Sequence, residues 1–548
     1  MVALALVLRL TFVTGIVHSD AVGYAQAAHD LATKGLHLGA DGVGRGRLGT
    51  YAPLALFYAL FGVSQATTLA WPLFCSLATV GLIYAITCLL AGESAGLIAA
   101  LVWAILPLDI SLATSLLPDG PLTTFSAAGI LLLLLAERSK GWKALAYYVS
   151  CALCLVAASL VKQTGLILFL FLSVYLISTK RFRWKFLAIG LAVACLAGAL
   201  FWYHFRFTPT WLAETGGGSR FSLDTLITTS TAWYRALTQA REFFVLLPLF
   251  VVAIAASLAR RLEGAAFAAL WLATTFLYME LGTRSPFVYL PWSPEIWQVR
   301  ILDFTMVPCA VLVGIYLGGA NRPGVTRIVV AAAAIVVAGV ALHGSRDMPT
   351  LPGWLPGQPD SARPFAGLSA LAGAVAIFGA IASPAIVTSR SRLVTAAGVA
   401  VLVGAVGLGT LNASYEATTD YHMPWVQNVR EAVRFLRFQP DRQWLAQNWL
   451  LGAHLDYHSG FSRGFDAADP SLKIFRRDAG LQVAPPDVSE IGSAYVITDE
   501  FFERKDVGMG GPAYLHARPP TWREIATFGT LDGYRMHIYM VPAAADGR

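Results

Sequence analysis

The sequence predicts a mainly α-helical protein that crosses a membrane many times and carries a C-terminal α/β domain outside it. Of its 548 residues, 56% are hydrophobic and 13% are charged, and the mean hydropathy is +0.60. A soluble chain of this length needs far more charge to cover its surface. Apolar runs that are long enough to span a bilayer, or nearly so, recur about thirteen times before Asn412. Beyond that residue the composition becomes polar.

These observations divide the chain into a predicted membrane domain, residues 1–411, and a predicted extracytoplasmic domain, residues 412–548. In the second part, Val426, Val429, Val433 and Leu436 recur at helical spacing, 494–498 is typical of a buried strand, and 523–529 with 534–541 predicts a hairpin. A further apolar stretch, 52–63, is too short to span and predicts a half-helix or a helix on the membrane surface. The predicted spans are 2–18, 65–90, 94–107, 121–136, 144–160, 164–178, 186–203, 242–258, 264–281, 301–318, 325–343, 365–387 and 393–411.

Short basic loops predict the orientation of the chain, because Lys and Arg are enriched in loops on the cytoplasmic side. With the N-terminus in the cytoplasm, every short cytoplasmic loop carries at least two basic residues. The long loops at 19–51, 204–241, 282–300 and 344–364 then face outward, and an odd number of spans places the C-terminal domain on that side too. In a bacterium this is the periplasmic side of the cell membrane. The basic loops are 137–143, 179–185, 259–263, 319–327 and 388–392.

The same charges argue against a nucleic-acid-binding protein. The formal net charge is +7, but much of the excess lies in the short loops that set orientation. All six cysteines lie in apolar stretches and predict no disulfide framework. No cluster of His and Cys predicts a metal site, and we interpret Asp456-Tyr457-His458 as structural.

Charged residues on the predicted outer face are candidates for chemistry, because a charge beside apolar sequence is costly unless it faces protein, water or a ligand. Asp20 follows the first span and begins a predicted short helix, where it could equally serve as a first-turn capping residue. The cations could equally extend to lipid headgroups or lie in solvated loops. Two carboxylates and several cations at one face fit a phosphate-bearing lipid beside a group that accepts a proton. The candidates are Asp20, Asp119, Lys162, Arg45, Arg47, Arg284 and Arg300.

Five short motifs follow one another along the chain, each at the predicted outer face. They are Asp20-Ala-Val-Gly-Tyr24, Tyr51-Ala-Pro53-Leu54, Asp119-Gly-Pro121-Leu122, Lys162-Gln-Thr-Gly165 and Arg300-Ile-Leu-Asp-Phe-Thr-Met-Val-Pro308. In this order the chain resembles the GT-C glycosyltransferases that use polyprenyl-phosphate sugars, especially the aminoarabinose-transferase and protein O-mannosyltransferase group. The resemblance covers most of the chain.

The resemblance implies a GT-C fold and transfer of one sugar, with inversion, from a polyprenyl phosphate to a hydroxyl of an envelope lipid, glycan or protein. It implies that Asp20 is the general base and that Asp119 orients the acceptor or the sugar. Tyr24 and Tyr51 would contact substrate, and neither a metal nor a cofactor would be required. The implied phosphate-binding residues are Lys162, Arg300, Arg47, Arg45 and Arg284.

The chain departs from the group in three places. Tyr51-Ala52-Pro53 replaces a Lys-Pro-Pro element, so Arg45 or Arg47 is expected to substitute for the missing lysine. Asp20-Ala21 replaces a common Asp-Glu pair. A Trp-Trp-Asp motif is absent, which argues against transfer to asparagine.

Two other functions remain open from the residues alone. A ligase that moves a preassembled glycan from a polyprenyl diphosphate would need more cations, which Arg220, Arg235 and Arg284 could supply. A lipid or solute transporter would show inverted hydropathy repeats and broken helices with charges near the middle of the membrane. The charges gather instead at the predicted outer face, which favours the transferase.

Overall fold

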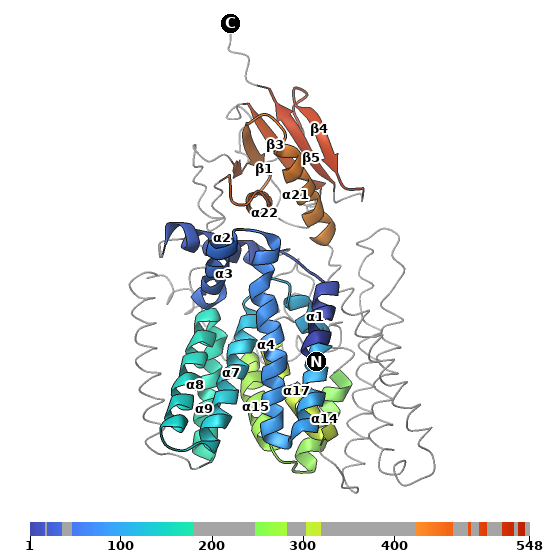
Figure 1. Cartoon of the computed structure of the whole chain (residues 1–548). Helices are drawn as coiled ribbons and strands as arrows, with labels where there is room; N and C mark the ends of the chain where they lie inside the picture. The colour runs from blue at the N-terminus through green and yellow to red at the C-terminus, as the bar shows by residue number, and fades with distance from the viewer. Residues whose placement is uncertain are drawn as a thin grey trace, which may run out of the picture.

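The computed structural model describes part of the 548-residue chain, and its helices form a bundle beneath a small sheet domain (Figure 1). The described residues are 1–16, 19–35, 47–179, 247–281, 303–318, 422–463, 481–483, 493–500, 518–530 and 535–542. The predicted spans 186–203, 325–343, 365–387 and 393–411 lie outside this part. So do three of the five basic loops, apart from Thr179 at the start of one.

The first 180 residues supply most of the described helices. Within the predicted outer loop 19–51, the described residues form the helix α2 (Ser19–Lys34) and the start of α3 (Leu48–Phe61). The bundle itself is formed by α1 (Val2–Thr11), α4 (Gln65–Ala91), α5 (Glu93–Ala104), α6 (Pro107–Leu112), α7 (Asp119–Arg138), α8 (Gly141–Val161), η1 (Gln163–Leu166), α9 (Ile167–Ser178), α14 (Leu247–Ala259), α15 (Ala265–Leu281) and α17 (Asp303–Gly318).

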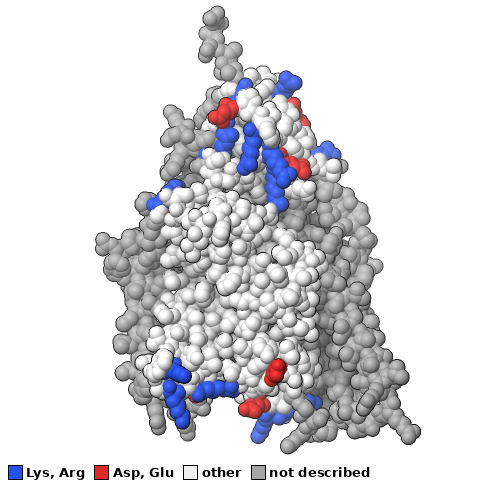
Figure 2. Space-filling view, in the orientation of Figure 1, with Lys and Arg blue, Asp and Glu red and all other residues white. Residues whose placement is uncertain are grey.

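A membrane location fits both the lengths of these helices and their surface. Among the described residues, α4, α7 and α8 are long and apolar enough to cross a bilayer, and several shorter apolar helices pack beside them. Figure 2 shows a broad surface without charged side chains, with Lys, Arg, Asp and Glu gathered at its lower edge and over the sheet domain. The chain is a multi-pass membrane protein. Its total number of spans stays a prediction.

Two predicted spans are wrong in their extent. The run 2–18 is helical only to Thr11, and Gly15 takes a φ of +82°, which ends a right-handed helix. The run 94–107 is broken after α5, because proline disfavours helical geometry in the residue before it, and Pro107 then begins α6. The resulting helices are too short to cross a bilayer as straight rods.

The two described basic loops lie at one end of the bundle. Arg138 donates to the carbonyl of Leu89, and a Cβ on Gly264 would meet the side chain of Leu90, so both loops meet at the C-terminal end of α4. Asp119 lies toward the opposite end, since Thr124 of α7 donates to the Cys75 carbonyl at 2.8 Å. This arrangement agrees with the positive-inside pattern, although which end faces the cytoplasm stays a prediction.

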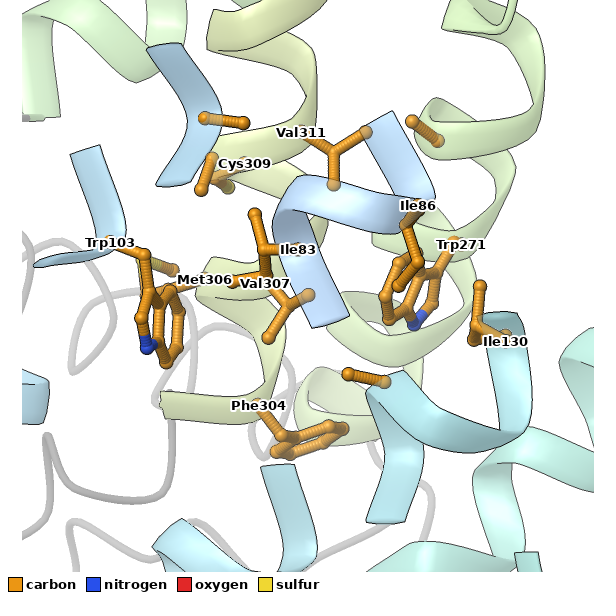
Figure 3. Close-up of a cluster of buried hydrophobic side chains, with 14 of the residues drawn as sticks. Ile83, Ile86, Trp103, Ile130, Trp271, Phe304, Met306, Val307, Cys309 and Val311 are labelled. Carbon is orange, nitrogen blue, oxygen red and sulfur yellow. The ribbon is translucent and has the colours of Figure 1, made fainter. Parts of the chain in front are cut away.

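The helix α17 runs through the centre of the membrane domain and is buried along nearly its whole length. Phe304 and Val307 of α17 lie buried in one cluster with Trp103 of α5 and Trp271 of α15 (Figure 3). On one side, Cβ atoms built on Gly314 and Gly318 would lie 2.4 Å from the Ala95 carbonyl oxygen and 2.6 Å from the Ala95 Cα. Glycines four residues apart therefore allow α17 and α5 to pack backbone against backbone.

The C-terminal part holds a five-stranded mixed sheet in the order β2-β1-β3-β5-β4. The strand β1 (Gln443–Ala446) pairs in parallel with β2 (Leu481–Val483) and β3 (Ala494–Asp499), whereas β5 (Met536–Val541) pairs antiparallel with β3 and with β4 (Arg523–Phe528). The predicted strand 494–498 and the predicted hairpin are confirmed. The predicted stripe of valines and leucine lies buried on α21 (His422–Leu436).

The helix α22 (Trp449–His458) connects this sheet domain to the membrane domain. The Tyr457 hydroxyl donates to Thr68 Oγ1 at 2.9 Å, and the same oxygen lies 2.7 Å from the Tyr58 hydroxyl. Nearby, the ring of Phe461 stacks on His29 with 4.6 Å between centroids. The domain therefore contacts α2, α3 and the first turn of α4, at the end opposite the two described basic loops.

Candidate functional site

An ion pair between Asp119 and Lys162 occupies the upper end of the bundle. Lys162 Nζ lies 2.7 Å from Asp119 Oδ1, and the two side chains are 15% and 2% exposed. Asp119 begins α7, whereas Lys162 takes an extended conformation between α8 and η1. The turn after it requires a glycine, because a Cβ on Gly165 would lie 2.6 Å from the backbone of Ala158. Two of the predicted site residues are thus brought together.

Two more predicted residues meet between α2 and α3. Arg47 donates to the Tyr24 hydroxyl, and its guanidinium carbon lies 5.7 Å from the centre of the Tyr24 ring. Tyr24 is fully buried and shares one apolar cluster with Tyr51 and Leu116. The guanidinium keeps further N–H donors for another anion, since it carries five.

A close backbone contact joins these two pairs. A Cβ on Gly49 would lie 2.8 Å from the backbone nitrogen of Val161, and Thr50 Oγ1 donates to the Val161 carbonyl at 3.3 Å. Arg47 precedes Gly49 by two residues, and Lys162 directly follows Val161. The structure therefore gathers both described candidate cations around the junction of α3 and α8.

Asp20 lies in the first turn of α2, where its side chain is partly buried. It precedes Tyr24 by four residues, a spacing that places both on one helix face. The chain before it is fixed to the loop that leads into α7, because the Thr14 nitrogen donates to Thr114 Oγ1 at 2.8 Å and the Gly15 nitrogen donates to the Thr114 carbonyl at 2.9 Å. One loop thus helps to position both candidate carboxylates.

Sequence reasoning missed a second charged cluster inside the bundle. Arg9 is fully buried and forms an ion pair with Asp109, while its Nε lies 2.5 Å from Ser76 Oγ. Asp303 is also fully buried, and its Oδ2 accepts from Thr123 at 2.8 Å. Each of these charged residues lies within or beside an apolar run of the sequence. Because a charge there is costly without a partner, this position could have indicated a buried ion pair.

Three candidate residues, Arg45, Arg284 and Arg300, lie outside the described residues. Within the described ranges, His, Cys, Asp and Glu nowhere form a group of three that could hold a metal ion. The described site thus offers a carboxylate on α2, a Lys–Asp pair and an arginine, which together can accept a proton and bind a phosphate.

The comparisons with known proteins agree with the predicted resemblance. Residues 49–202 match the family model of dolichyl-phosphate-mannose-protein mannosyltransferase. The structure is similar to that of ArnT from Cupriavidus metallidurans in the apo state, with 16% identity, a TM-score of 0.62 and coverage of 98% of this chain and 96% of that one. It is also similar to ArnT from the same organism bound to undecaprenyl phosphate, with 16% identity, a TM-score of 0.61 and coverage of 98% and 97%. Among curated proteins, none matches the sequence significantly.

The resemblance to GT-C glycosyltransferases is therefore confirmed. The matching family model and the similar structures are those of glycosyltransferases, and the chain shares their fold across nearly its whole length. The matched residues 49–202 include Tyr51, Asp119 and Lys162, but the assignment of a role to each residue stays a prediction.

Proposed function

We propose that this protein is an inverting glycosyltransferase that moves one sugar from a polyprenyl phosphate to a hydroxyl acceptor at the outer face of the membrane. The observation that carries the proposal is the close contact of α3 with α8, beside which Lys162 pairs with the Asp119 carboxylate and Arg47 precedes α3 and binds Tyr24. The structure of ArnT with bound undecaprenyl phosphate supports the choice of donor class.

In the proposed reaction, Asp20 accepts the proton of the acceptor hydroxyl as its oxygen attacks the anomeric carbon of the sugar. The bond from that carbon to the phosphate oxygen breaks, and the phosphate leaves with the bonding electrons. Lys162, Arg300 and Arg47 stabilise the negative charge that grows on it, and Arg45 and Arg284 also bind the phosphate. Asp119 holds the Lys162 ammonium in place and orients the acceptor or the sugar, and Tyr24 and Tyr51 contact substrate.

Phosphate leaves as a stable anion, so the scheme contains neither a general acid nor a metal. The partners are a lipid-linked sugar and a lipid, glycan or protein acceptor, and we place the site and residues 412–548 on the periplasmic or extracellular side. We extend the prediction that Arg47 substitutes for the missing lysine of the Lys-Pro-Pro element, because Arg47 directly precedes α3, which packs against α8 one residue before Lys162.

The Asp20→Asn variant tests the proposed base. Asparagine has nearly the same shape but does not take the proton, so donor binding should persist while turnover falls about 10²–10⁴-fold. The measurement is single-turnover release of polyprenyl phosphate from a polyprenyl-phosphate sugar by the purified protein. Asp30→Asn is the matched control, since Asp30 lies on the same helix but pairs with Lys34 at 2.7 Å.

Near-normal transfer by Asp20→Asn would show that Asp20 only caps α2 and would make Asp119 the candidate base. Release of a polyprenyl diphosphate from a diphosphate-linked glycan by the unmodified protein would instead identify a ligase. No release of lipid from either donor would contradict the transferase proposal as a whole.

A further inference from the structure

A buried hydrogen bond joins the start of α17 to the helix that carries Asp119. Asp303 is the first residue of α17 and is fully buried, and its Oδ2 accepts from Thr123 Oγ1 at 2.8 Å. Thr123 is also fully buried and follows Asp119 by four residues, so both side chains lie on one face of α7. We call this contact of Thr123 with Asp303 the α7–α17 link.

The burial of Asp303 costs stability. Its Oδ1 is buried and has no hydrogen-bond partner among the described residues, and within the same ranges the carboxylate forms no ion pair. Asp109 and Asp119 lie close enough to repel its charge, and Arg9, which attracts it, is already paired with Asp109. A leucine at this position would avoid the desolvation of an unpaired oxygen. A buried polar group with an incomplete set of partners is typical of a functional position, because core packing alone does not explain it.

The α7–α17 link lies one helical turn from the pair that Asp119 forms with Lys162, in which Lys162 Nζ is 2.7 Å from Asp119 Oδ1. A second hydrogen bond fixes the neighbouring face of α7, since Thr124 Oγ1 donates to the Cys75 carbonyl of α4 at 2.8 Å. One such attachment leaves a helix free to rotate about its axis, whereas two attachments on different faces fix its rotation. The link therefore helps to determine where the first turn of α7 directs the Asp119 carboxylate.

We propose that Thr123 and Asp303 are positioning residues for sugar transfer, because their hydrogen bond holds Asp119 against Lys162. Neither of the two side chains needs to touch substrate. A buried polar contact specifies one arrangement of the packed helices, whereas apolar groups of the same shape allow small shifts. A misplacement of about 1 Å can slow a reaction about 10²-fold. The word transfer rests on the proposed function, but the coupling of the link to the ion pair does not.

The first test replaces the link with apolar groups. The double variant Thr123→Val/Asp303→Leu removes both partners and keeps their approximate shape, a change that is often neutral or stabilising. We expect an unchanged or higher melting temperature in detergent, with single-turnover release of polyprenyl phosphate about 10-fold slower. Thr123→Ser keeps the hydroxyl and should keep most of the rate. Ser126→Ala is the matched control and should transfer normally, because this buried hydroxyl of α7 donates to the Leu122 carbonyl of its own helix at 2.6 Å.

A normal rate in the double variant would overturn the proposal. An equal loss of rate in Thr123→Ser would also overturn it, because serine preserves the hydrogen bond. If the double variant melts at a lower temperature than expected, the second test decides between positioning and a role in folding alone.

The second test determines whether the link acts through the ion pair. Thr123→Val, Lys162→Met and their combination are compared with the unmodified protein. If Thr123→Val already moves Asp119 away from Lys162, then Lys162→Met has less of the pair left to remove. The combined loss of rate should therefore be at least about 5-fold smaller than the product of the separate losses, and the combined loss of melting temperature should be smaller than their sum. Losses that multiply in rate and add in melting temperature would overturn the proposal.

The melting temperatures in this second test require neither a donor nor turnover. If no lipid-linked sugar proves to be a substrate, the proposed function fails, whereas the comparison of melting temperatures still tests the coupling of the α7–α17 link to the ion pair. A smaller combined loss than the sum would then support the coupling, and additive losses would contradict it.

Discussion

Two Asp-to-cation pairs in the membrane domain have the same chemistry but different surroundings. Arg9 and Asp109 are both fully buried, and Arg9 also binds Ser76 and the carbonyl oxygens of Ala5 and Ala104 at 3.1 and 3.0 Å. Lys162 also meets its carboxylate directly, but 15% of its side chain is exposed. A fully buried cation that binds only groups of the protein stabilises the fold, whereas a cation that remains partly exposed can also bind a ligand. We therefore interpret the first pair as structural and the second as part of the site.

The largest expected effect that separates the two pairs is on stability. Arg9→Met leaves Asp109 buried without its cation, and breaking a buried pair in this way costs about 3–5 kcal/mol. Lys162→Met should cost clearly less, because its end of the bundle is partly accessible to water. Thermal unfolding of the two purified variants in the same detergent measures the difference. Equal losses of stability would remove the distinction between the pairs.

The next effect concerns turnover, and here we expect the larger loss for the Lys162 variant rather than for the Arg9 variant. Lys162→Met removes a cation from the proposed leaving group, so transfer should fall about 10²–10³-fold, as when one stabilising donor is lost. Lys162→Arg keeps the charge and should retain more of the rate. The measurement is polyprenyl-phosphate release, together with donor affinity. Unchanged kinetics in Lys162→Met would assign Lys162 to contact with lipid headgroups instead.

The smallest expected effect is the pH dependence of stability that arises from His458, a buried ionisable group of the sheet domain. Burial, followed by the nearby Arg430 guanidinium, lowers the pKa of His458 from 6.5 to about 3. Below pH 6.5 the unfolded imidazole therefore binds a proton that the folded one does not, and stability falls as the pH drops from about 6.5 toward 3. Between pH 7 and pH 5 we expect a loss of about 1–2 kcal/mol that His458→Gln removes. Melting curves at the two pH values measure it, and an identical pH dependence in the variant would contradict the assignment.

The pairing of Asp119 with Lys162 could be predicted from the sequence, because each residue interrupts apolar sequence at the same predicted face. The pairing of Arg9 with Asp109 was not. The two residues are separated by 100 positions, and no local pattern relates them. Asp109 was also hidden by the interpretation of 94–107 as one span, whereas the proline at 107 begins a separate helix that turns this carboxylate into the bundle.

The fold class, the two described basic loops at one end of the bundle and several elements of the C-terminal part followed from periodicity and charge. The order of the sheet did not, since parallel pairing of β1 with both β2 and β3 depends on contacts distant in sequence. Nor did the contact of Tyr457 with Thr68, which places the sheet domain on α4. Both depend on tertiary packing, for which a single sequence holds no periodic signal.

The backbone contact of Gly314 and Gly318 with Ala95 has a mechanical consequence. Two helices in such close contact do not slide past each other unless the contact opens, so α5 and α17 form a fixed anchor for the rest of the molecule. By the same argument the contact of Gly49 with Val161 holds α3 to α8. We therefore expect rearrangements on substrate binding to involve α2 and the sheet domain, which meets α4 through Tyr457 and Thr68. We accordingly expect paired spin labels to report a larger change of distance on donor binding between α2 and α7 than between α5 and α17. We thus expect the core of the bundle around α5 and α17 to stay fixed while the α2 segment moves relative to it.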